Sequence, residues 1–177
     1  MFCFNPNFNK NISNWNVSLV EDMTGMFEAC EKFNQDLSNW CVLLLPTKPE
    51  WFDTSATAWA LPRPVWGTCP SNSDGGGVDS EMGIRADYPG TGWYKATDTG
   101  TVFNKGIPEG ETHVFGDSPK EYVSVYTMEN AKLYGERAAV SNITNMDYWF
   151  DGDTEFNEDI SSWDVSNVVS MEYTFGA

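Results

Sequence analysis

Hydrophobic positions in this chain recur with a period of 25 residues. The segment 8–15 returns at 33–40 and again at 156–163, with Phe, Asn, Ser and Trp in matching places. A second half-unit, which begins with Val-Ser and ends with a Met and a Phe, occurs at 17–27, 140–150 and 165–175. Agreement at this many positions exceeds what composition alone produces, so the sequence predicts stacked structural repeats.

Each unit contains the patterns of a short strand and of one helical turn. The Trp-x-Val-Ser stretch alternates in polarity, which is typical of a strand, and the stretch 23–27 fits one helical turn. One unit buries too little apolar surface to offset the ordering of its backbone, so units must stack with like side chains in ladders. We therefore predict an α/β fold: a leucine-rich-repeat-like solenoid with short parallel strands and short helical turns, plus a small β-rich insert.

One polar position also recurs with the period. Asn9, Asn34 and Asn157 occupy equivalent places. Amide side chains both donate and accept hydrogen bonds, so we expect an internal ladder in which these asparagines bind backbone groups at each bend. A ligand-binding role is the alternative for the same residues.

The repeats resemble a known family. The pattern Phe-Asn-x-Asp-Ile-Ser-x-Trp-Asp-Val-Ser-Asn-Val-x-x-Met-x-x-x-Phe, at 156–175, is similar to the BspA-like, leucine-rich-repeat-related units of bacterial and algal surface proteins. The stretch 40–70 resembles the closing segment of such arrays and 122–146 the opening segment, so the resemblance covers about 1–70 and 120–177. It implies a cell-surface or secreted protein with an adhesion or interaction role. Because the closing segment comes first here, the chain is expected to be cut from a tandem series or permuted.

Breaks in the pattern divide the chain into four parts. Residues 1–70 form a repeat block with its closing segment, and 71–83 are rich in Gly and Ser, as flexible linkers are. Residues 84–127 contain short alternating stretches between Gly and Pro, which predict a β-rich insert or cap. Residues 128–177 hold the opening segment and the start of a second repeat block.

The net charge limits the classes of partner that the chain is expected to bind. The formal net charge of −16 argues against nucleic acid and anionic membranes, which attract clustered Lys and Arg. It favours solubility, association with cations or a positively charged partner. No stretch approaches the ~20 apolar residues of a membrane span, so membrane insertion is not expected. The first residues lack the pattern of a signal peptide, so either the signal has been removed or the chain is part of a longer one.

The cysteines indicate an oxidising compartment. There are four of them, with no Cys-x-x-Cys pair and only one histidine, His113, so disulfides are favoured over a zinc site and the location is expected to be extracellular or the cell surface. We predict a bridge between Cys41 and Cys69 that closes over the end of the first block. A second bridge is predicted between Cys3 and Cys30, which follow equivalent Phe residues on adjacent units.

Candidate chemistry is sparse. The segment 151–155 resembles the start of a calcium loop, but Phe156 and Ser162 stand where an EF-hand needs Gly and Glu. A looser calcium site at this acidic turn is the alternative to a solvated turn. No nucleophile motif accompanies His113, so we expect no catalytic residue, no cofactor and no enzymatic activity. Three N-glycosylation acceptors occur, of which the first is favoured: Asn11, Asn16 and Asn142.

Two functions follow from these observations. The leading expectation is a structural or adhesive component of an extracellular or cell-surface assembly. The alternative is a receptor module that binds surface carbohydrates or proteins, and an exposed aromatic patch that the repeat ladder does not explain would favour it.

The repeat pattern also predicts self-association. Phe2, Phe8 and Trp15 lie at one edge of the array and Phe175 at the other, and each edge lacks the half-unit that the other offers. Uncapped repeat edges expose apolar surface, so we expect Phe175 of one copy to contact the segment 2–8 of the next, which generates an open filament. The rival hypothesis is that the chain is one period of a longer tandem polypeptide.

Overall fold

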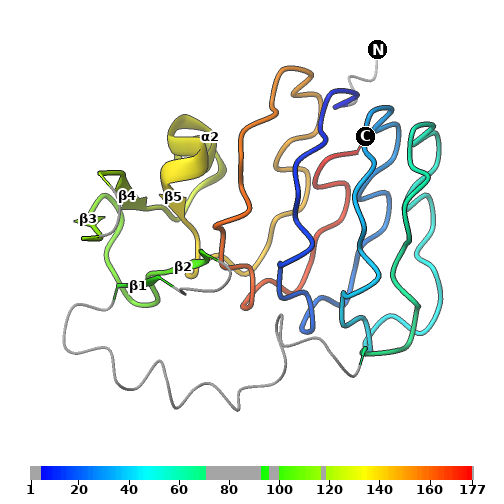
Figure 1. Cartoon of the computed structure of the whole chain (residues 1–177), viewed down its shortest axis with the longest axis horizontal. Helices are drawn as coiled ribbons and strands as arrows, with labels where there is room; N and C mark the ends of the chain where they lie inside the picture. The colour runs from blue at the N-terminus through cyan, green and yellow to red at the C-terminus, as the bar shows by residue number, and fades with distance from the viewer. Residues whose placement is uncertain (1–4, 71–92, 96–99, 117–118, 177) are drawn as a thin grey trace.

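A computed structural model describes residues 5–70, 93–95, 100–116 and 119–176 of this chain. Within these ranges, regular secondary structure lies at one end of the molecule (Figure 1). Its elements are the strands β1 (Tyr94–Lys95), β2 (Val102–Phe103), β3 (Thr112–Val114), β4 (Glu121–Ser124) and β5 (Ala138–Ala139), the helix α2 (Met128–Tyr134) and the 3-10 helix η1 (Gly135–Arg137). Among the residues described, no helix is both long and apolar enough to cross a membrane.

These elements form two small sheets. Strands β1 and β2 pair antiparallel, and a second sheet has the order β3-β4-β5, with β3 antiparallel and β5 parallel to β4. Helix α2 makes the crossover between β4 and β5. It begins at Thr127, whose hydroxyl accepts a hydrogen bond from the amide of Asn130, and ends at Gly135, which has a positive φ of 49°.

The predicted solenoid of parallel strands and helical turns is wrong. No named strand or helix lies in the described parts of the repeat units, which retain only isolated parallel bridges such as Asp22 with Ser170. Turns interrupt the backbone instead. The Asn16 carboxamide accepts from the amide of Ser18 at 3.1 Å, and equivalent Asx turns recur along the chain. Backbone hydrogen bonds still link neighbouring units, for example Met171 N–H to Asp22 O at 2.8 Å and Phe175 N–H to Met26 O at 3.1 Å, but the linked segments are not extended strands.

Equivalent positions of the units nevertheless lie side by side, and their order follows from the three repeat tryptophans together with Trp59 of the closing segment. Each indole Nε1 donates to a backbone carbonyl of the neighbouring unit at 2.9–3.2 Å: Trp163 to Gly135, Trp15 to Ile160, Trp40 to Ile12 and Trp59 to Gln35. In space the opening segment is therefore followed by the last unit, then by the first and second units, and finally by the closing segment. Two parts that are far apart in the sequence join into one stack (Figure 1).

The expected hydrogen bonds from the repeat asparagines to backbone groups are confirmed, but Asn9 and Asn157 are exposed, so the ladder lies at the surface and not in the interior. The side-chain oxygen of Asn157 accepts from the amide of Asn9 at 3.2 Å, and that of Asn9 accepts from the amide of Asn34 at 2.9 Å. The Asn34 oxygen then accepts from Ala60 and Leu61 in the closing segment. The same hydrogen bond thus links the last unit to the first and the first to the second.

Aromatic rings fill the interior of the stack. Phe175 lies at the centre and is fully buried. Its ring stacks on Phe150 at a centroid distance of 5.2 Å and on Phe8 at 3.9 Å, and Phe8 stacks in turn on Phe33 at 5.8 Å. Burying several large aromatic side chains provides most of the driving force for stacking.

A buried polar network joins the region that contains β1–β5 to the repeats. The Asn104 carboxamide donates to Ser124 Oγ at 2.7 Å and to the Ala139 carbonyl, and its oxygen accepts from the amide of Ser141. Ser141 Oγ donates to the Asp164 carboxylate at 2.6 Å, which reaches the last repeat unit. Every buried polar side-chain atom in this network has a hydrogen-bond partner. The network therefore fixes the position of this region without leaving a buried polar group unpaired.

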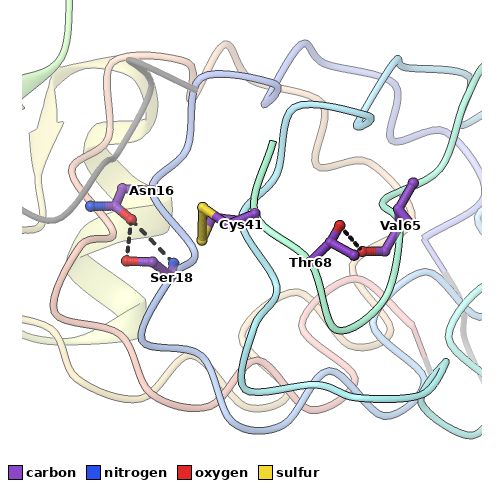
Figure 2. The surroundings of a disulfide bond; sticks show 6 residues. Asn16, Ser18, Cys41, Val65 and Thr68 are labelled. Atoms are coloured by element: carbon purple, nitrogen blue, oxygen red, sulfur yellow. Dashed lines mark hydrogen bonds between the residues drawn. A yellow bond between two sulfur atoms is a disulfide. The ribbon is translucent and has the colours of Figure 1, made fainter. Parts of the chain in front are cut away.

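The opposite end of the stack is closed by a covalent bond. A disulfide joins Cys41 to Cys69, and Figure 2 shows it beside the turn in which Thr68 Oγ1 donates to the Val65 carbonyl at 2.6 Å. The bond ties the closing segment to the second unit across a sequence separation of 28. Closing a loop of this length stabilises the fold chiefly by restricting the unfolded chain.

Candidate binding surface

One turn position has the same unusual backbone conformation in four consecutive units of the stack. In spatial order, Tyr148, Tyr173, Gly25 and Trp51 have φ values of 59°, 47°, 59° and 53°. Their register is fixed by three backbone hydrogen bonds at 2.8–2.9 Å: Tyr148 N–H to Glu172 O, Tyr173 N–H to Thr24 O and Gly25 N–H to Glu50 O. Tyr148, Tyr173 and Gly25 thus each donate to the residue just before their counterpart in the next unit. We call the three aromatic side chains at this position, Tyr148, Tyr173 and Trp51, the aromatic row.

The aromatic row lies on the surface. Tyr148 is 47% exposed and Trp51 is 51% exposed, whereas the repeat tryptophans are buried. The rings of Tyr148 and Tyr173 are nearly parallel, with centroids 5.4 Å apart. The Tyr173 ring also covers Gly25, where any Cβ would clash with it. A side chain at this place would have to displace the Tyr173 ring, and this close contact accounts for the glycine in the row.

The backbone of the row is strained. A left-handed conformation costs a residue with a side chain roughly 1–2 kcal/mol, and bulky aromatic residues rarely adopt it. Three of the four positions here carry Tyr or Trp rather than Gly. Such outliers persist where the surrounding structure holds them, and they cluster at ligand-binding sites. Ala29 and Ser55 have the same conformation elsewhere in the stack, so it is the combination of this strain with exposed aromatic side chains that marks the row as a candidate site.

Carboxylates flank the rings. The Tyr148 hydroxyl donates to Glu172 Oε1 at 2.9 Å, and this bond to a carboxylate is the main cause that raises the pKa of Tyr148 to about 12. Partial burial raises the pKa of Tyr173, and the nearby charges of Glu28, Glu172 and Glu50 raise it further. The pKa of Glu28 is itself raised by burial. The surface thus combines aromatic faces with a concentration of negative charge.

This arrangement suits binding rather than catalysis. Exposed aromatic rings provide flat apolar surface at a low cost in conformational entropy, and carboxylates accept hydrogen bonds from hydroxyl or ammonium groups. Among the residues that the structure describes, no group of three or more His, Cys, Asp or Glu is arranged to hold a metal ion. At the acidic turn 151–155, Asp153 instead pairs with Lys132 at 3.3 Å and accepts from the amide of Phe156.

The predicted self-assembly edges meet within one chain. Phe8 and Phe175 stack on each other, and Trp15 lies against both Phe175 and Trp163. All of these residues are buried in the stack. Phe2 lies outside the described residues.

The predicted bridge between Cys3 and Cys30 is wrong for Cys30, which is a free, buried cysteine. Its Sγ donates to the Phe175 carbonyl at 3.3 Å, so the last repeat unit lies next to this cysteine. Burial raises the pKa of this thiol far above its usual range. Cys3 lies outside the described residues. The other predicted pair, Cys41 and Cys69, forms a disulfide in the structure.

The remaining candidates lie apart from the row. The His113 ring stacks on Trp93 at 5.7 Å and meets Phe115 edge-on. Of the glycosylation acceptors, Asn11 is exposed, whereas Asn16 and Asn142 are half-buried. Asn142 also donates through its Nδ2, the atom that a glycan would modify, to the Asn104 carbonyl at 3.0 Å. The structure therefore leaves Asn11 as the most accessible of the three acceptors.

Sequence reasoning did not single out the aromatic row. Tyr148 and Tyr173 are 25 residues apart and could have been found as a repeat position. Trp51 could not, because the second unit has one extra residue between Val42 and Trp51 compared with Val17 to Gly25, which shifts it out of the period. Only the backbone hydrogen bonds and the shared positive φ reveal the alignment.

One comparison relates the chain to known sequences. A family model described as "Mycoplasma protein of unknown function, DUF285" matches residues 1–61 and 123–177. These two segments, about two thirds of the chain, are the parts that join to form the stack, and the matched ranges leave out β1–β3 and most of the sequence around them. No curated protein and no solved structure shows significant similarity to the chain.

Proposed function

This chain belongs to the family described as "Mycoplasma protein of unknown function, DUF285", and from that premise we propose that it is an adhesive binding module of an extracellular or cell-surface protein. The module holds its ligand against the aromatic row formed by Tyr148, Tyr173 and Trp51. The finer resemblance of the repeats to BspA-like units of surface proteins is part of the same proposal. Binding, rather than catalysis, is the function that the geometry supports best.

The observation that carries the proposal is the exposure of the row in a strained conformation. Most large aromatic residues of the repeats are buried in the stack, and their role in folding is sufficient to explain them. Tyr148 and Trp51 are about half exposed and occupy left-handed backbone, which costs stability. A cost of this kind is expected where side chains serve a ligand.

One property supports an extracellular setting, and a second bears on the class of ligand. The disulfide between Cys41 and Cys69 is a bond that persists in oxidising compartments. The net charge of −16 keeps an exposed aromatic surface soluble and disfavours polyanionic ligands.

Binding to immobilised probes tests the proposal. The probes are a hexa-arginine peptide, a hexa-lysine peptide and neutral hexasaccharides of glucose, mannose and N-acetylglucosamine, with the whole chain in solution. We expect the wild type to bind at least one probe class and the double variant Tyr148→Ala/Trp51→Ala to lose that binding. Tyr126→Ala is the matched control, because Tyr126 is a 42% exposed tyrosine outside the row. Binding that survives in the double variant, or a wild type that binds no probe, contradicts the proposed function.

Self-association is a second candidate function, and the junction between the last and first units favours it. This junction uses the same Asn and Trp hydrogen bonds as the junction between the first and second units. Because only noncovalent contacts hold it, the last unit of one copy can pair with the first unit of another. Exchange of this kind is head-to-tail and generates open filaments.

Refolding at several protein concentrations tests the second candidate. Contacts within one chain dominate in dilute solution, whereas contacts between chains gain with concentration. We expect light scattering after refolding at high concentration to show a series of oligomers, and electron microscopy to show linear assemblies. Monomers alone at every concentration would contradict self-association.

A further inference from the structure

Three carboxylates lie close to the aromatic row. Glu172 lies beside Tyr148 and Tyr173, and Glu28 and Glu50 are close enough to Tyr173 to raise its pKa. Within the described part of the chain, none of these three carboxylates forms an ion pair with Lys or Arg, although Asp53 and Asp153 do. The row therefore presents aromatic faces together with unneutralised negative charge.

We infer that the ligand of the aromatic row is a basic protein segment, whose Arg and Lys side chains lie over the rings and pair with Glu28, Glu50 and Glu172. This inference rests on the proposed binding function and names the class of partner. A guanidinium or ammonium group is attracted to the face of Trp or Tyr, and a neighbouring carboxylate adds a charge-assisted hydrogen bond. The two interactions together require the residue types that the row supplies.

The same chemistry already occurs inside this chain. The Arg63 guanidinium lies over the Trp59 ring at 4.5 Å from its centroid, and its Nε donates to the Asp53 carboxylate at 2.8 Å. Trp51 and Glu50 provide the same two side-chain types, an indole and a carboxylate. At the row, the ligand would supply the arginine. The closing segment therefore provides an internal example of what a ligand arginine would do at the row.

The shape of the row favours an extended partner. Its four backbone positions are linked unit to unit by backbone hydrogen bonds, and neighbouring chain segments joined in this way lie about 4.8 Å apart. A single small cation would engage one ring, whereas a segment with several basic side chains can engage Tyr148 and Trp51 together. Multiple contacts along one segment raise the affinity beyond that of each contact alone.

Charge neutralisation separates this inference from its rivals. The triple variant Glu28→Gln/Glu50→Gln/Glu172→Gln keeps the rings and removes three charges. Its control, Glu111→Gln/Glu121→Gln/Glu155→Gln, removes three charges from exposed residues outside the row. The probes are the hexa-arginine peptide and the neutral hexasaccharides, each titrated with the whole chain at low and at physiological salt.

We expect the wild type to bind hexa-arginine, with an affinity that falls as salt is added. The triple variant of the row should bind hexa-arginine about tenfold more weakly, and the control triple variant should lose much less of its affinity. Equal losses in both triple variants would show attraction to net charge alone and would overturn the inference. Binding of a hexasaccharide but not of the peptide would also overturn it, while the proposed binding function would stand. A wild type that binds neither probe would overturn both.

Discussion

The rings of Phe8 and Phe175 stack with their centroids 3.9 Å apart and their planes 7° from parallel, although the two residues belong to opposite parts of the sequence. This contact joins the last repeat unit to the first. The aromatic row depends on the junction, because Tyr148 and Tyr173 come from one side of it and Gly25 and Trp51 from the other. The candidate site is thus a product of the way the two parts assemble.

Replacing Phe175 by Ala should lower the free energy of unfolding by about 3–5 kcal/mol, because the ring is fully buried and contacts Phe8, Phe27 and Phe150. Urea denaturation followed by fluorescence measures the change. Val169→Ala is the control, since Val169 is 44% exposed in the same unit and its loss should cost little. If Phe175→Ala does not fold, Phe175→Leu provides a milder test. Equal, small losses at both positions would contradict the junction.

Asn104→Ala should destabilise the protein by about 1–3 kcal/mol, because it leaves the buried amide of Ser141 without its acceptor and Ser124 without a donor. Hydrogen exchange at β4 and β5 should also become faster. The comparison is Asn130→Ala, which removes an exposed hydrogen bond to Glu109 and should cost well under 1 kcal/mol. A change no larger than that of Asn130→Ala would show that the network does not hold this region in place.

Tyr148 should ionise with a pKa of about 12, above the ordinary value of a tyrosine, because its hydroxyl donates to Glu172. A pKa raised by folding means that the neutral hydroxyl stabilises the native state. That contribution is complete below the ordinary tyrosine pKa and is lost as the pH rises through about 12. The difference in tyrosinate absorbance between the wild type and Tyr148→Phe isolates this group. Glu172→Ala should lower its pKa, and an unchanged titration in that variant would refute the assigned cause.

Trp51→Gly should separate stability from binding. Glycine adopts the positive φ of 53° without strain, and this gain of roughly 1–2 kcal/mol offsets the loss of the buried half of the Trp51 side chain, so we expect the free energy of unfolding to change by no more than about 1 kcal/mol. Binding to the row should be lost in the same variant. Trp59→Gly is the contrast, because Trp59 is buried and its loss should destabilise strongly. A large loss of stability in Trp51→Gly would indicate that Trp51 serves the fold and not a ligand.

The sequence predicted the parts of the fold that depend on identical residues at a fixed period. Asn9, Asn34 and Asn157 form the expected ladder because equal side chains at equal places make equal hydrogen bonds. The strands and helical turns were predicted wrongly. Polarity patterns do not reveal that the side chains of Asn16 and its equivalents bind the backbone and turn it within each unit.

The spatial order of the units could not be predicted, because like units offer like surfaces and periodicity does not say which pair meets. Phe8 finds Phe175 through contacts between distant parts of the chain. The candidate site was missed for a related reason. Its four positions hold Tyr, Tyr, Gly and Trp, and they share a backbone conformation rather than a residue type.

A nuclear Overhauser effect between the ring protons of Phe8 and Phe175 tests the central claim most directly. The sample contains chain with isotope-labelled phenylalanine, diluted about tenfold with unlabelled chain and studied at low concentration. Centroids at 3.9 Å place the ring protons well within range, so we predict a cross-peak whose intensity per labelled molecule does not change on dilution. A missing cross-peak would contradict the joined stack. A cross-peak that weakens on dilution would show that the contact forms between chains instead of within one.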